Sequence, residues 1–172
     1  MIQEKTGIVH MMGKPMTLLG PALKMGDSAP EFMLLDNSLK AVKLADSAGK
    51  IRLFSIVPSL DTEVCAIQTE HFSKAVKNLA DNLVFYTISM DLPFAQKRWI
   101  EDNELTNVIT LSDFNWADFG LHYGVLLKEL RLLTRAVVVI DTQDKIVNYQ
   151  IVPEITDEPD YGEIIEAIKK IS

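Results

Sequence analysis

Short apolar runs of strand length alternate along this chain with segments in which apolar residues recur at helical spacing. The runs Ile51 to Val57 and Leu83 to Ser89 are mostly apolar, which is typical of strands buried inside a sheet. A helical pattern follows each run, over about Thr62 to Ala80 after the first and from Pro93 onward after the second. Strands that alternate with helices build layers in which helices cover a sheet. The alternation therefore predicts an α/β fold with a central sheet.

The rest of the chain supplies further elements. Strands are predicted at Glu31 to Asp36, Ala41 to Leu44, Asn107 to Leu111, Ala136 to Ile140 and Ile146 to Val152. Helices are predicted over PFAQKRWIED, around Trp116 to Tyr123, and after Pro159. An opening β-hairpin over Gly7 to Gly20, together with the two adjacent strands near the end, indicates a mixed sheet. Because no repeat, low-complexity tract or linker interrupts residues 1–172, we expect a single domain.

Net charge limits the partners that the chain can have. The sequence holds 17 basic and 24 acidic residues, a formal net charge of −7, which repels nucleic acid and anionic lipid. No apolar run approaches the roughly 20 residues that span a bilayer. Charged residues interleave Met1 to Thr17, so this segment lacks the apolar block of a secretory signal. We expect no nucleic-acid or membrane partner and a cytoplasmic location.

Cys65 is the only cysteine of the chain. A disulfide within one chain is therefore impossible, and so is a metal site built from clustered cysteines. The carboxylates Glu63, Asp113 and Asp118 form no metal-binding pattern, so we predict neither a metal nor a cofactor. A lone cysteine is usually a small buried apolar residue, and a reactive one needs surroundings that stabilise its thiolate.

The predicted surroundings of Cys65 favour the reactive form. Cys65 falls in the first turn of the helix that follows the strand Ile51 to Val57, where unpaired N–H groups and the helix dipole stabilise negative charge. Thr62 lies three residues earlier and can bring a hydroxyl to the sulfur or to an incoming oxygen. Pro58 shapes the exit from the strand and can shield the site from water. These features suit a thiol that reduces peroxides.

The segment Pro58 to Cys65 resembles the peroxiredoxin signature, in which a proline and a threonine stand seven and three positions before the peroxidatic cysteine. Three further segments, Ser89 to Trp99, Leu130 to Val137 and Val152 to Tyr161, carry the resemblance along nearly the whole chain. Together with the opening hairpin they are similar to the bacterial thiol peroxidase subfamily of the peroxiredoxins.

The resemblance implies a thioredoxin-like fold, a homodimer and roles for four residues. Cys65 would attack hydrogen peroxide or an organic hydroperoxide and become a sulfenic acid. Thr62 would hydrogen-bond the thiolate and the substrate, and Pro58 would screen the sulfenic acid. Arg135 matches the active-site arginine of the family, although without the resemblance an ordinary ion-paired residue would be the better interpretation.

Ile100 is the main departure from the family. Most of these proteins carry a second, resolving cysteine directly after an aromatic residue, and here Ile100 follows Arg98-Trp99. Three explanations are open: a one-cysteine enzyme reduced by an external thiol such as thioredoxin, an engineered variant, or a protein that has drifted towards sensing. We favour the first, and we expect increased over-oxidation of Cys65 because no thiol of the same chain traps its sulfenic acid.

Other functions are weaker candidates. A disulfide oxidoreductase needs Cys-x-x-Cys, and Gln68 stands at the second position. A cysteine hydrolase needs a paired histidine, and His71 lies about 120° around the helix from Cys65. A peroxide sensor or non-catalytic binding protein on the same fold remains the main alternative, because it would keep the same residues.

Five aromatic side chains are predicted to belong to the core, with an apolar pocket or a subunit interface near Cys65 as the alternative for some of them. They are Phe94, Trp99, Phe114, Trp116 and Phe119.

Overall fold

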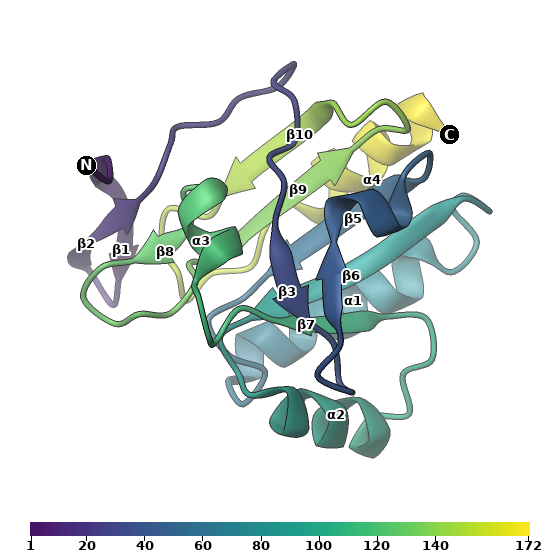
Figure 1. The fold of residues 1–172 in the computed structure, drawn as a ribbon, viewed down its shortest axis with the longest axis horizontal. Coiled ribbons are helices and arrows are strands. Elements are labelled where there is room, and N and C mark those ends of the chain that lie inside the picture. Colours follow the sequence, from purple (N-terminus) through teal and green to yellow (C-terminus); the bar gives the residue numbers. More distant parts are fainter.

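A seven-stranded mixed sheet forms the centre of the computed structural model, which describes residues 1–172 (Figure 1). In spatial order its strands are β10 (Ile146–Ile151), β9 (Ala136–Ile140), β5 (Ile51–Ile56), β6 (Leu83–Ser89), β7 (Ile109–Ser112), β3 (Met33–Leu35) and β4 (Ala41–Lys43). The pairs β5–β6 and β6–β7 are parallel and the others are antiparallel. The predicted α/β fold with a mixed sheet is confirmed.

Two apolar cores lie on opposite faces of the sheet. Along β5, Leu53 belongs to the core that includes residues of α1 (Glu63–Val76) and α4 (Tyr161–Ile171), and Phe54 belongs to the other core. Successive side chains of a strand point to opposite faces, so a strand that is buried on both faces contributes apolar side chains to both cores. Helices α1 and α4 lie behind the sheet in Figure 1, and α3 (Asp118–His122) lies in front of it.

The predicted N-terminal hairpin consists of β1 (Glu4–Met11) and β2 (Lys14–Leu19). It pairs with the short strand β8 (Leu126–Leu127), which the sequence did not indicate, and forms a second, three-stranded sheet. The carboxylate of Glu154 accepts hydrogen bonds from the N–H groups of Met12 and Gly13 at the hairpin turn, at 3.0 and 3.1 Å. The turn is therefore tied to the segment that precedes α4.

The helices differ from prediction mainly at their ends. Helix α2 (Pro93–Asp102) begins at the predicted proline, whereas α1 ends at Val76 and not near Ala80. The Leu79 N–H donates to Val76 O three residues earlier, at 3.1 Å, so the chain tightens into a turn there. A short 3₁₀ helix, η1 (Leu44–Ser47), was not predicted. No helix combines the length and the apolar composition that crossing a membrane requires.

Three of the five aromatic residues predicted for the core are exposed. Phe119 is buried and stacks on Tyr123 with ring centroids 4.2 Å apart. Phe94 is 63% exposed and Trp116 52% exposed, and Phe114 is also exposed. Helix α2 buries Pro93 and Gln96 instead. The prediction is wrong for Phe94, Phe114 and Trp116, because aromatic character alone does not say which face of an element meets the sheet.

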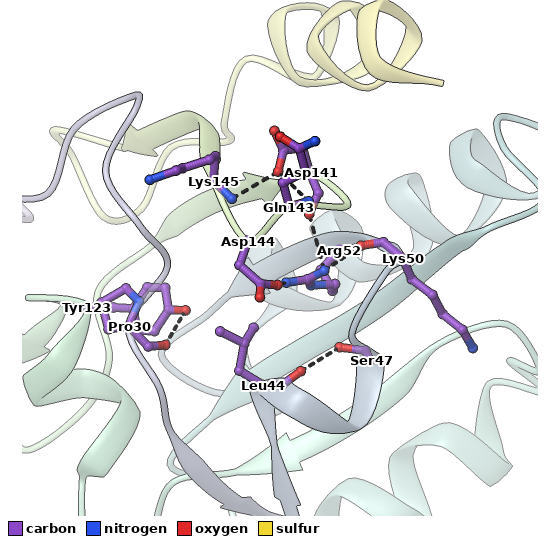
Figure 2. Close-up of polar contacts among 10 residues, drawn as sticks. All are labelled: Pro30, Leu44, Ser47, Lys50, Arg52, Tyr123, Asp141, Gln143, Asp144 and Lys145. Carbon is purple, nitrogen blue, oxygen red and sulfur yellow. Dashed lines mark hydrogen bonds and ion pairs between the residues drawn. The ribbon is translucent and has the colours of Figure 1, made fainter.

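Arg52 forms a buried polar cluster near the start of β5, at the end of that strand away from α1 (Figure 2). Its guanidinium is fully buried, donates to the carbonyl oxygens of Lys50 and Asp141, at 2.5 and 3.2 Å, and pairs with the carboxylate of Asp144. A buried cation needs such partners because burial removes it from water. This cluster closes the end of the sheet opposite the predicted catalytic cysteine.

Candidate active site

Cys65 lies in the first turn of α1, as the sequence predicts, directly beyond the carboxyl end of β5. Thr62 is the N-cap residue of the helix, and its side chain caps no backbone N–H group. The first N–H groups of an α-helix have no partner within the helix and carry its positive dipole end. The Cys65 side chain is fully buried, so this positive end acts on the sulfur with little screening by water.

The sulfur of Cys65 has two polar neighbours. The Thr62 Oγ1 lies 2.6 Å from Sγ, and the Arg135 Nη2 lies 3.3 Å from it. The Thr62 hydroxyl is also 3.0 Å from the carbonyl oxygen of Ser59. Because a hydroxyl has one proton, Thr62 donates either to the sulfur or to Ser59. If Cys65 is a thiolate, its sulfur accepts the hydrogen bond from the Thr62 hydroxyl. If Cys65 is a protonated thiol, the hydroxyl can donate to the carbonyl oxygen of Ser59 instead.

Arg135 is held by neutral groups only. The side chain is almost completely buried, its Nε donates to the carbonyl oxygen of Ile155 at 2.7 Å, and its Nη1 donates to Gln68 Oε1 at 2.9 Å. No ion pair joins Arg135 to a carboxylate. A buried cation without an anion is costly, so the charge of Arg135 is available to stabilise negative charge that develops next to it during a reaction.

Gln68 is a site residue that the sequence analysis missed. It is fully buried, and it donates to the Ser55 hydroxyl at 2.7 Å while it accepts from Arg135. In the sequence it mattered only as a missing cysteine of a Cys-x-x-Cys motif. Its position three residues after Cys65, on the same face of α1, is the signal that would have suggested it.

A cavity of about 130 Å³ lies next to Thr62 and Arg135, the two residues that contact the sulfur, whereas Cys65 itself is fully buried and does not line it. It is lined by Met11, Pro58, Thr62, Glu63, Val64, Arg135, Ile155 and Thr156. Three of the four predicted site residues, Pro58, Thr62 and Arg135, are therefore walls of one cavity, and the fourth, Cys65, touches two of them. Met11 comes from the N-terminal hairpin, so the hairpin closes one side of the site.

Ile100 does not lie against Cys65. Its side chain packs against the core that contains Phe72 and Val108, whereas Cys65 belongs to a small cluster with Val57 and Leu60. The neighbouring residue Trp99 packs against that small cluster. Ile100, at the position of the usual resolving cysteine, therefore faces the apolar core against which α2 packs.

Two histidines and Asp113 make no hydrogen bond to the Cys65 sulfur. His71 stacks on Tyr161 with ring centroids 3.7 Å apart, and His122 lies 3.5 Å from the carboxylate of Asp118. Burial raises the pKa of Asp113 to about 6, against the opposing effect of hydrogen bonds from the N–H groups of Gly120 and Phe119. No group of three or more His, Cys, Asp or Glu side chains is arranged to hold a metal ion.

The sequence matches known proteins along most of its length. Residues 24–165 match the model of the Redoxin family. The chain is 49% identical to a thiol peroxidase of Oceanobacillus iheyensis over 162 residues, which cover 94% of this chain and 98% of that protein. It is 50% identical to a thiol peroxidase of Staphylococcus aureus over 163 residues, which cover 95% of this chain and 98% of that one.

Solved structures agree with these matches. A peroxiredoxin-like protein from Aquifex aeolicus superposes with a TM-score of 0.90 at 37% identity, over 97% of this chain and 99% of that one. A thiol peroxidase from Chromobacterium violaceum superposes with a TM-score of 0.86, over 94% of this chain and 95% of that one. At 20% identity the second similarity concerns the fold alone.

Proposed function

The chain belongs to the Redoxin family and, within it, to the thiol peroxidases, and we propose that it reduces hydrogen peroxide and organic hydroperoxides with Cys65 as the nucleophile. The observation that carries this proposal is the position of the Cys65 sulfur. It lies 2.6 Å from the hydroxyl of Thr62 and 3.3 Å from the guanidinium of Arg135, beside a cavity that both residues line. A nucleophile flanked by a neutral donor and a fixed cation suits attack on a polar O–O bond.

The first half-reaction consumes one peroxide and one proton. The thiolate of Cys65 attacks the terminal oxygen of the hydroperoxide, an S–O bond forms and the O–O bond breaks. The departing oxygen takes up a proton and leaves as water or an alcohol, while Cys65 remains as a sulfenic acid. Arg135 stabilises the charge that moves from sulfur to the leaving oxygen, Thr62 hydrogen-bonds the reacting atoms, and Pro58 screens the sulfenic acid from water.

The second half-reaction uses an external thiol such as thioredoxin. With Ile100 at the position of the resolving cysteine and no second cysteine in the chain, the sulfenic acid condenses with a thiol of another molecule. A mixed disulfide forms and water leaves. A second thiol then releases the Cys65 thiol as the other two sulfurs form a disulfide. A second peroxide competes with this step and produces sulfinic acid.

Three wider properties belong to the same proposal. Residues 1–172 act as one domain, and the protein works in a reducing compartment, the cytoplasm, where thiol reductants are supplied.

We also propose a homodimer. The exposed side chains of Phe94, Phe114 and Trp116 support it, since aromatic side chains are enriched at protein interfaces. Sedimentation velocity of the wild type tests this, and a monomer at micromolar concentration would refute the dimer.

A peroxide sensor is the second candidate, favoured by the isoleucine at position 100. A sensor reacts once per chain, whereas an enzyme consumes many equivalents of peroxide when thiol is supplied. Peroxide consumption with an excess of thioredoxin and its reductase separates the two functions by the number of turnovers.

The direct test is intact-mass analysis after one equivalent of hydroperoxide, with a sulfenic-acid trap. We expect a fast single-oxygen adduct that external thiol reverses, and no adduct in the Cys65→Ser variant. If the wild-type thiol stays unmodified under these conditions, the proposed chemistry is absent.

A further inference from the structure

Asp91 lies two residues after the end of β6 and hydrogen-bonds the loop that leads from β5 to the active-site helix. Its Oδ1 accepts a hydrogen bond from the Ser59 hydroxyl at 2.6 Å, and its Oδ2 accepts one from the Leu60 N–H at 2.8 Å. The Ser89 hydroxyl donates to the same Oδ2 at 2.7 Å. Both carboxylate oxygens are thus used, and two of the three donors belong to residues between Pro58 and Thr62.

The held loop residues are the ones that contact the catalytic groups. The carbonyl oxygen of Ser59 accepts from the Thr62 N–H at 3.2 Å and lies 3.0 Å from the Thr62 hydroxyl. That hydroxyl is the group 2.6 Å from the Cys65 sulfur. Leu60 is buried in the cluster that contains Cys65. A continuous set of contacts therefore runs from Asp91 through Ser59 to Thr62 and the sulfur.

The other side of Asp91 is anchored to the sheet. The Gln96 side chain donates to the Ser89 hydroxyl at 3.0 Å and to the carbonyl oxygen of Leu111 in β7 at 2.9 Å. The Ser112 hydroxyl donates to the backbone carbonyl of Asp91. Gln96 and Ser89 are fully buried. Asp91 is thereby fixed relative to β6, β7 and α2. Its hydrogen bonds to Ser59 and Leu60 in turn hold the irregular loop before α1 in place.

We propose that Asp91 is a positioning residue for peroxide reduction, which sets the Thr62 hydroxyl at the Cys65 sulfur through Ser59 and Leu60. This inference rests on the proposed reaction of Cys65. Hydrogen bonds to a carboxylate are stronger than those between neutral groups, and a displacement of about 1 Å at a reacting centre costs on the order of 100-fold in rate. Without the Asp91 carboxylate, the loop can shift so that the Thr62 hydroxyl donates to the Ser59 carbonyl oxygen and no longer to the Cys65 sulfur.

The test measures the second-order rate constant of Cys65 oxidation in Asp91→Ala, Thr62→Val and the double variant. We expect Asp91→Ala to be slower than wild type by about 10-fold or more. In the Thr62→Val background the same change should cost less than about twofold, because Asp91 acts through the hydroxyl that Thr62→Val has already removed. If the two effects multiply instead, Asp91 acts by another route and the inference is wrong.

Two further variants separate positioning from stability. Asp91→Asn keeps one oxygen that can accept from Leu60 and Ser89, so it should recover part of the rate and provides a folded variant if Asp91→Ala unfolds. Ser73→Ala is the matched control. Ser73 belongs to α1, the helix that carries Cys65, and its hydroxyl donates to Asn107 Oδ1 at 2.5 Å, but it does not contact the sulfur. We expect the substitution to lower the melting temperature without slowing oxidation.

The outcomes distinguish this inference from the proposed function. A wild-type Cys65 that peroxide does not oxidise refutes the function itself. A wild type that reacts rapidly, with Asp91→Asn and folded Asp91→Ala at the same rate, refutes only the role of Asp91.

Discussion

Replacement of Arg135 is expected to slow oxidation of Cys65 without unfolding the protein. The guanidinium donates to three acceptors: Ile155 O at 2.7 Å, Gln68 Oε1 at 2.9 Å and the Cys65 sulfur at 3.3 Å. Arg135→Met removes the charge and all three donors but keeps much of the apolar stem. Arg135→Lys keeps the charge and loses the planar arrangement of donors.

The expected magnitude follows from these contacts. A hydrogen bond to a charged group contributes about 1.5–3 kcal/mol, and loss of one preorganised donor to a transition state typically costs about 100- to 1,000-fold in rate. We expect Arg135→Met to react about 100-fold more slowly than wild type, and Arg135→Lys about 10-fold more slowly, since a lysine still supplies positive charge.

The cost in stability should be smaller than for most buried arginines. Because no carboxylate pairs with Arg135, its removal leaves no carboxylate without a partner, and the Cys65 sulfur keeps the Thr62 hydroxyl at 2.6 Å. The substitution leaves two neutral acceptors, on Ile155 and Gln68, at about 1–3 kcal/mol each if they stay unpaired. Arg135 lines the cavity beside the sulfur, so water can take over part of this pairing.

Stopped-flow fluorescence is a suitable assay, because Trp99 packs against the cluster that contains Cys65. Rates are compared with wild type at equal peroxide concentration, and circular dichroism establishes that each variant is folded. Equal oxidation rates in folded Arg135→Met and wild type would refute the role assigned to Arg135.

Three further predictions concern Gln68, Ile100 and Asp113. Gln68→Glu should slow oxidation of Cys65 at neutral pH by about 10- to 100-fold, because the new carboxylate pairs with Arg135 and repels the thiolate; a rate equal to wild type in stopped-flow measurements would show that neutrality at this position is unimportant. Ile100→Cys should lower the yield of sulfinic acid per turnover, measured by intact mass, because the oxidised protein can then form a disulfide within the chain; an unchanged yield would mean that α2 does not open. Asp113 has a folded pKa of about 6, raised mainly by burial, so the native state binds more protons than the unfolded state between about pH 4 and 6. Its contribution to stability is therefore greatest at the acidic end of this window and falls, by at most about 3 kcal/mol, as the pH rises to 6; denaturant unfolding of wild type and Asp113→Asn should show this difference, and parallel pH profiles would contradict it.

The fold was predictable where periodicity and burial agree. β9 was predicted over the residues that form it, Ala136–Ile140, because the charged residues Arg135 and Asp141 mark both ends of this apolar run. The start of α2 was fixed by Pro93, which suits the first turn of a helix. The two-residue strand β8 is too short to show periodicity, and it exists because the hairpin supplies its partner.

The site was predictable only in part, for a physical reason. The spacing of Pro58, Thr62 and Cys65 is local: the first turn of α1 brings Thr62 to Cys65, and Pro58 lies in the short loop that leads into this helix. The contact between Cys65 and Arg135 spans 70 positions in the sequence, so only the family resemblance indicated it. The positions of Gln68 and Asp91 follow from buried polar groups that need partners, and a sequence does not show which groups meet.

The buried sulfur makes opposite demands on the two half-reactions, and Asp91 lies between them. Peroxide is small enough to enter the cavity of about 130 Å³ that Thr62 and Arg135 line next to the sulfur, and oxidation gains from a loop that is held rigidly. A protein thiol must bring its own sulfur into contact with Cys65, which is fully buried, so the loop from Ser59 to Thr62 or the first turn of α1 has to open. The carboxylate that fixes the loop opposes this opening. Asp91→Ala should therefore slow oxidation by peroxide and speed reduction of the sulfenic acid by thioredoxin, with both rates measured separately by stopped flow. A decrease in both rates would mean that thioredoxin reduces the sulfenic acid without opening the loop.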